Sequence, residues 1–234
     1  MRHKDVRHCS IGAMAFLLAL RFEITQEFDH FQAQDWIDNS KWFDIKLLVD
    51  ATRSNTNFTL PLKNDTYSKA MKAVLEHLKI PSSHWVHLGR VVGPKILEMQ
   101  EEDAEEIRRL GNWNPTIQET SYSNKLPLQP MRKMAGFNTA MGMYFNPRTT
   151  VMPSEELLAL TPFSFAFSAC DEVEEAVKDV GGSYTALSFL RFLKELAIVF
   201  LQDSAAMMAL HPERKVHPVF SLNVFQSNTF EVRM

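Results

Sequence analysis

The chain has 234 residues, of which 45% are hydrophobic, so it is long enough for one large domain or two small ones around a substantial core. Its formal net charge of −3 excludes a protein that coats nucleic acid with basic charge overall, so any nucleic-acid surface must be local. Cys9 and Cys170 show neither metal-ligand nor disulfide spacing. The apolar run 11–20 is too short to cross a bilayer, which predicts a core helix rather than a membrane anchor.

A buried helix is predicted for residues 5–21. Small residues such as Gly12 permit close packing, and the phenylalanine and leucines that follow can fill an interior. Arg21 stands at the end of this apolar run, where a charge needs a partner. An ion pair with Glu23 or Glu27 is one interpretation of this position.

The next regular pattern predicts a β-hairpin. Apolar and polar side chains alternate in residues 44–50, residues 52–57 are polar and turn-rich, and the strand pattern resumes in residues 58–62. Lys46 lies on the polar face of the first strand, and Arg53 lies nearer the tip. For either residue, a solvated charge is the simplest interpretation.

Three helices are predicted after the hairpin. Residues 66–79 carry an apolar stripe, and Asp65 is suited to cap its start. The next helix contains His87 and Arg90, which are three positions apart and therefore share a face. Residues 101–110 begin with acids and end with arginines, which fits the dipole of a helix.

Four side chains between residues 87 and 122 have the chemistry to contact a phosphodiester. The planar guanidinium of Arg90 can bind two phosphate oxygens. His87 and Trp113 can each donate a hydrogen bond, and the phenol of Tyr122 can donate one or attack as a nucleophile. Taken singly, such residues are usually core or ordinary surface. Their occurrence together in this order favours a functional role over a purely structural one.

The stretch from residue 123 to residue 148 has no acidic residue. Its four positive charges are Lys125, Arg132, Lys133 and Arg148. Because backbone phosphates supply most of the sequence-independent affinity for DNA, this basic strip is the best local candidate for a phosphate-facing surface. A solvated loop is the alternative, since four charges over this length are a modest density.

Beyond residue 148 the composition changes, and no catalytic pattern is evident. The sequence predicts a short helix over 153–160, an apolar helix over 184–201 and a second over 204–210. The helix over 184–201 is apolar on more than one face, so it should be buried on several sides. We expect residues 149–234 to form a helical extension packed on a first unit of residues 1–148.

The order His-x-x-Arg, Gly-x-Trp and Tyr matches the last part of the tyrosine recombinase signature. The segments that carry the match are 87–93, 111–114, Tyr122 and 125–137, together with Arg7-His8-Cys9, Gly12-Ala13 and Arg21-Phe22. These segments resemble the second domain of the large DNA-binding subunit of the budding-yeast centromere complex. That domain and its fungal relatives are similar to Crypton-type tyrosine recombinases.

The resemblance implies roles for particular residues. Arg21 stands at a position like that of the first catalytic arginine, and Lys46 or Arg53 lies where recombinases place a lysine on a hairpin. Tyr122 is the candidate nucleophile, and no other residue is assigned a catalytic role. The implied DNA phosphate-binding residues are Arg21, His87, Arg90, Trp113, Lys125, Arg132 and Lys133, with Lys46 and Arg53 as weaker candidates.

We predict a mainly α fold with a small antiparallel β-hairpin sheet, like the catalytic domain of a tyrosine recombinase with a C-terminal helical extension. The predicted function is DNA binding in a nucleus without strand cleavage. Cleavage needs hydrogen-bond donors on both non-bridging phosphate oxygens and an acid that protonates the leaving oxygen. Among the candidate residues, only Arg90 is firmly matched to one of these roles. We expect DNA as partner, and no cofactor, metal, membrane or small-molecule substrate.

Two other classes of function stay open. A recombinase-derived or transposase-derived enzyme would use Tyr122 as its nucleophile. A structural module would have buried core side chains in place of the recombinase-like site and would dimerise through its C-terminal helices. A second copy of the chain, forming a homodimer, is therefore an alternative partner. Side chains of Arg21, His87 and Arg90 that converge and face solvent would favour phosphate binding or catalysis, whereas sealed side chains would favour the structural module.

Overall fold

Helices form the regular structure of the chain in a computed structural model that describes residues 1–24, 35–43, 45–49, 60–82, 85–111, 127–137, 144–180, 184–213, 217–227 and 230. The elements are η1 (Val6–His8), α1 (Ser10–Ala19), η2 (Leu20–Ile24), α3 (Asn39–Trp42), α4 (Asn64–His77), α5 (Leu88–Met99), α6 (Ala104–Leu110), α8 (Leu128–Met134), η3 (Pro147–Thr150), α9 (Glu155–Ala159), α10 (Phe165–Val180), α11 (Tyr184–Leu210), η5 (Pro218–Ser221) and α12 (Asn223–Gln226).

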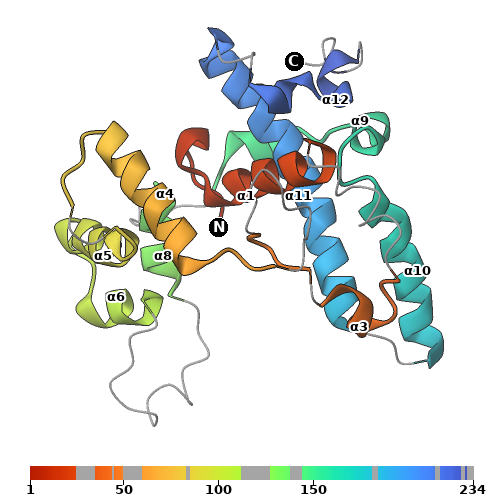
Figure 1. The fold of residues 1–234 in the computed structure, drawn as a ribbon, viewed down its shortest axis with the longest axis horizontal. Helices are drawn as coiled ribbons and strands as arrows, with labels where there is room; N and C mark the ends of the chain where they lie inside the picture. Colours follow the sequence, from red (N-terminus) through yellow and green to blue (C-terminus); the bar gives the residue numbers. More distant parts are fainter. Residues whose placement is uncertain are drawn as a thin grey trace.

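The long helix α11 is the centre of the fold, and α1 and α10 pack along it (Figure 1). Leu190, Leu193, Leu196 and Phe200 of α11 are fully buried. A helix that is apolar around most of its circumference must be covered on several sides. The prediction that this helix is buried on several sides is confirmed.

Helix α11 runs unbroken through the point where the sequence predicted a boundary between two helices. That boundary falls at residues 202–204, Gln-Asp-Ser, which are polar and buried. Neither glycine nor proline is present there to stop a helix. The charge of Asp203 is neutralised by Arg2 and Arg148, so the polar run continues as buried helix.

Aromatic rings fill the end of the core near α3. Trp36 and Trp42 are both buried. The ring of Trp42 stacks on Phe189 of α11, with centroids 5.7 Å apart. Trp36 stacks on Phe165 of α10, with centroids 6.1 Å apart. The short helix α3 and the residues before it place these two rings against the core.

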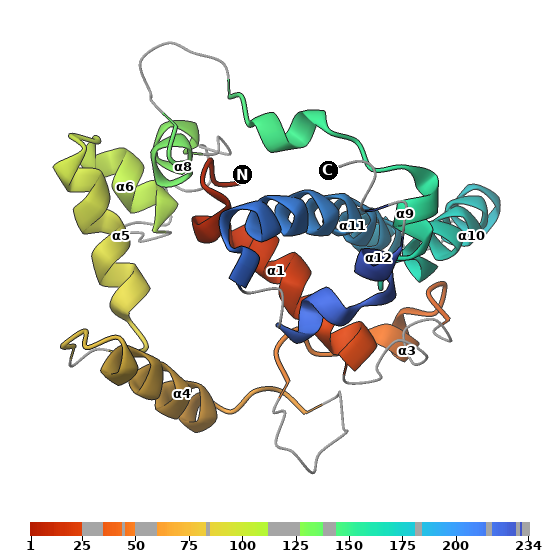
Figure 2. The same cartoon turned by 90° about the horizontal axis from the view of Figure 1, so that it is seen from above.

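A second group of helices lies to one side of this core (Figures 1 and 2). Helices α5, α6 and α8 contact one another, and α4 precedes them in the chain. Leu97 of α5, Ile107 of α6 and Ala135 at the end of α8 are buried. We call α5, α6 and α8 the α5 group, and we call α1, α10 and α11 the α11 group.

Helix starts differ from the sequence prediction by a few residues. Helix α1 begins at Ser10 rather than at residue 5, because Cys9 is extended and its Sγ accepts a hydrogen bond from the amide of Gly12 at 3.4 Å. Helix α6 begins at Ala104 rather than at residue 101. Its N-cap is Asp103, whose carboxylate accepts a hydrogen bond from the amide of Glu105 at 2.9 Å.

The predicted β-hairpin sheet is wrong, because no strand is present in the part of the chain that the structure describes. The two predicted limbs do meet, through one antiparallel bridge between Val49 and Pro61. Leu47 has no sheet face to cover and is exposed. Its carbonyl and that of Lys46 accept hydrogen bonds from Arg21, and proline has no N–H to offer, so a regular ladder does not form.

Candidate nucleic-acid interface

The start of α5 exposes the His87–Arg90 pair that the sequence singled out. His87 is the N-cap of α5, and Arg90 lies in its first turn, with both residues exposed. The first turn contains no acidic residue. The amides at a helix start lack intrahelical acceptors and carry partial positive charge, so this end of α5 attracts anions. Within the described residues, the His87 side chain makes no capping hydrogen bond, so it does not compete for those amides.

Lys133 of α8 is engaged with the rest of the α5 group. Its ammonium forms an ion pair with Glu102 at 2.7 Å and donates a hydrogen bond to the carbonyl of Gln100 at 2.7 Å. The Lys133 side chain is 14% exposed. Arg132, beside it in the last turn of α8, is half-buried. The partner Glu102 lies outside the acid-free strip, and for this reason the sequence count overstated the charge available there.

Arg21 is a buried residue, 5% exposed, at the foot of α1. Its guanidinium donates hydrogen bonds to the carbonyls of Lys46 and Leu47 at 2.7 and 2.6 Å. These bonds hold the segment 45–49 on the core. Lys46 itself is half-buried. The structure therefore places Arg21 beside the backbone of Lys46, and the phosphate-binding roles of both residues stay predictions.

Four of the predicted site residues, Arg53, Trp113, Lys125 and Tyr122, lie outside the described residues. Their phosphate-binding or catalytic roles stay predictions. The structure consequently bears on the predicted surface only through α5, α8 and the segment around Arg21.

Arg148, the last residue of the acid-free strip, belongs to a buried cluster that the sequence did not indicate. Its Nε lies 2.9 Å from the carboxylate of Asp203, which is fully buried in α11. Arg2 binds the same carboxylate and the side chain of Gln202. A Cβ at Gly12 of α1 would overlap a carboxylate oxygen of Asp203, so a larger residue there would displace the paired carboxylate. We call Arg2, Arg148 and Asp203 the Asp203 cluster. No sequence signal joins residues that lie so far apart in the chain.

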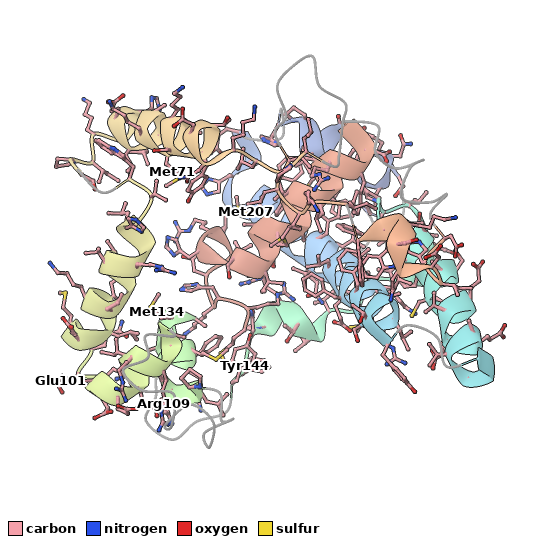
Figure 3. All side chains as sticks on the ribbon, turned by 60° about the horizontal axis from the view of Figure 1, so that its bottom comes forward. Met71, Glu101, Arg109, Met134, Tyr144 and Met207 are labelled. Atoms are coloured by element: carbon pink, nitrogen blue, oxygen red, sulfur yellow. The ribbon has the colours of Figure 1, made fainter. Side chains whose placement is uncertain are left out.

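The Asp203 cluster fixes the N-terminal segment, which we define as residues 2–8, between the two helix groups. The Tyr144 hydroxyl donates a hydrogen bond to the Arg2 carbonyl at 2.9 Å, and its ring packs on Phe137 beyond α8, with centroids 4.5 Å apart. Figure 3 shows Tyr144 in the space between the helices near Met134 and the core. The segment therefore joins the α5 group to α11.

Each charged residue of α6 forms an ion pair with another residue of the same helix. Arg108 binds Glu105, and Arg109 lies 3.0 Å from Glu106. The hydrogen bond from Arg108 lowers the pKa of Glu105 below its ordinary value. In the same way, the hydrogen bond from Arg7 lowers the pKa of Asp5 in the N-terminal segment. The acids of α6 thus form a solvated, internally paired surface.

In its described residues the protein is helical, and the start of α5 exposes His87 and Arg90. Over residues 1–231, the chain matches the family described as the centromere DNA-binding protein complex CBF3 subunit, domain 2, and it belongs to that family. Comparisons with curated proteins and with solved structures gave no match. None of the helices in the described part of the chain is long and apolar enough to cross a membrane.

Family membership confirms the predicted relationship to a subunit of a centromere DNA-binding complex. It implies a function in binding centromeric DNA and, with it, a place in the nucleus. It also suggests that the partners are DNA and the proteins of a complex. The kinship with Crypton-type recombinases and the fungal origin stay predictions.

Proposed function

We propose that the chain binds the DNA backbone through a recombinase-like phosphate-binding surface that includes the start of α5, and that it does not cleave the strand. Membership in the centromere DNA-binding family is the observation that carries the proposal. The exposed pair His87 and Arg90, at a helix start without acids, supports the location. Phosphates bind well at such a position because the helix dipole, the free amides and the guanidinium all favour an anion.

The proposal that the strand is not cleaved is supported by the position of Arg21. In-line attack on a phosphodiester requires donors that reach both non-bridging oxygens. The Arg21 guanidinium is buried and bound to two carbonyls of the segment 45–49. Loss of one well-placed donor typically costs about 10²–10³-fold in rate. Tyr122 would then lack the electrostatic support that makes a nucleophile effective.

The test of binding uses fluorescence anisotropy with two unrelated duplexes at low salt. Arg90→Gln should weaken binding to both duplexes by a similar factor, because a phosphate contact carries no sequence information. Arg191→Gln is the matched control, since Arg191 is an exposed arginine paired with Glu174 on the α11 group. Equal affinities of Arg90→Gln and Arg191→Gln would remove the start of α5 from the proposed surface.

The test of cleavage traps a covalent intermediate. The protein is incubated with a duplex that carries a phosphorothiolate at one position, and a denaturing gel is used to detect a protein–DNA adduct. We expect no adduct from the wild type or from Tyr122→Phe, with binding retained in both. An adduct that forms with the wild type and disappears in Tyr122→Phe would make the protein an enzyme instead.

Protein association is a second function that one observation favours. Helix α5 exposes Val91, Val92, Ile96 and Met99, the last being 85% exposed. Neighbouring apolar side chains that face solvent mark surfaces that bind other proteins. A subunit of a complex needs such a surface in addition to its DNA contacts. Ile96→Ser should leave DNA affinity unchanged and weaken co-purification with other subunits, and unchanged co-purification would contradict this assignment.

A further inference from the structure

We propose that a hollow beside the N-terminal segment binds a second backbone phosphate of the same DNA, an inference that rests on the proposed function. The hollow has a volume of about 600 Å³. Among the residues that line it are His3, Lys4, Asp5, Arg7 and Arg148. Of the ionisable residues in this lining, four are basic or histidine and one, Asp5, is acidic.

The backbone beside the hollow is held firmly in place. The amide of Lys4 donates a hydrogen bond to the carbonyl of Ala135 at 2.8 Å. The carbonyls of Lys4 and His3 both accept hydrogen bonds from the Arg148 guanidinium, at 2.6 and 2.9 Å. Since Arg148 is itself bound to buried Asp203, residues 3 and 4 are fixed to α11 as well as to the end of α8. A preorganised site loses less entropy when it binds a ligand.

The charges around the hollow leave an excess of positive charge. The Asp203 cluster contains two arginines and one aspartate, and Arg7 is paired with Asp5 at 2.6 Å. Lys4 is exposed, and its ammonium has no ion-pair partner among the residues described. The local sum is therefore two positive charges, with His3 beside them. An anion in the hollow would approach Lys4 without breaking an existing pair.

The hollow lies beside the end of α8. Gly136, which follows α8 and also lines the hollow, has a φ of +79°, a conformation that favours glycine. A Cβ at this position would meet the ring of His3 at 3.0 Å and the Cβ of Lys4 at 3.6 Å. The N-terminal segment therefore packs directly on the turn behind Arg132 and Lys133. His3 and Lys4, from the start of the chain, are therefore adjacent to the end of α8.

The experiment measures the salt dependence of DNA affinity for the full chain. Lys4→Gln should reduce the slope of log affinity against log salt by about one, the effect of losing one phosphate contact. Lys178→Gln is the matched control, because Lys178 is an exposed lysine in the last turn of α10 and its replacement changes the net charge equally. It should leave the slope unchanged.

A second variant tests whether the loss of a negative charge at the hollow strengthens DNA binding. Asp5→Asn removes the carboxylate that neutralises Arg7 and keeps a side chain able to cap η1, so it should strengthen binding at low salt. Thermal melting of each variant shows that the fold is retained. Wild-type binding with an unchanged slope in Lys4→Gln would overturn the second site alone, whereas no wild-type binding would overturn the proposed function with it.

Discussion

Helices α11 and α5 are both rich in apolar residues, but they use them differently. Leu190, Leu193 and Leu196 of α11 are fully enclosed by α1 and α10. Helix α5 buries Leu97 fully, while side chains such as Val92 face solvent. The α11 group therefore forms the buried scaffold, and the α5 group carries the contact surface that we propose. The N-terminal segment and the Asp203 cluster connect the two.

The largest effect should follow from a cavity in the scaffold. Phe200→Ala removes a fully buried ring from α11 and should lower the free energy of unfolding by about 3–5 kcal/mol. Phe192→Ala in the same helix is the control, because Phe192 is 39% exposed and its loss leaves a smaller cavity. Denaturant titration of both variants measures the difference. Equal losses would show that α11 is not the stabilising centre.

The connection between the groups should be the next most sensitive feature. Asp203→Ala leaves Arg2 and Arg148 without their carboxylate, and breaking a buried pair in this way costs about 3 kcal/mol or more. Glu174→Ala is the control, since its pair with Arg191 is exposed and contributes about 0–1 kcal/mol. If Asp203→Ala were as stable as Glu174→Ala, the Asp203 cluster would not hold the N-terminal segment.

The smallest effect concerns a surface ion pair of the α5 group. The hydrogen bond from Arg108 lowers the pKa of Glu105, so the stabilisation it gives is present above the unfolded pKa and is lost as pH falls through the folded pKa. Carboxyl-carbon NMR should place the Glu105 midpoint below its ordinary value and show it rising in Arg108→Gln. An identical midpoint in the two proteins would contradict the pairing.

The sequence predicted the helices well where local chemistry decides them. The burial of α11 and the charge order of α6, with acids in its first turn and arginines in its last, follow from residues close together in the chain. The hairpin failed because alternation alone does not make a sheet. The segment 45–49 is held by Arg21 from a distant helix, and this contact has no local signature.

The partners of charged residues were the other feature that the sequence did not reveal. Lys133 and Arg148 were counted in the basic strip over residues 123–148 because that stretch includes no acid. In the fold they meet Glu102 and Asp203, which are remote in sequence. Conversely, Lys4 precedes the helix predicted over residues 5–21 and was assigned to no surface. Charge density along the chain therefore measures a DNA surface poorly.

Hydrogen–deuterium exchange with and without DNA tests the division between scaffold and contact surface most directly. The amides of Leu88, Gly89 and Arg90 open α5 without intrahelical acceptors and should exchange rapidly in the free protein. Bound phosphates should slow exchange in peptides that cover this start, while α11 peptides around Phe200, already buried, should not change. Protection that is confined to the α11 group, with no change at the start of α5, would contradict the assignment of α5 as the DNA-contacting helix.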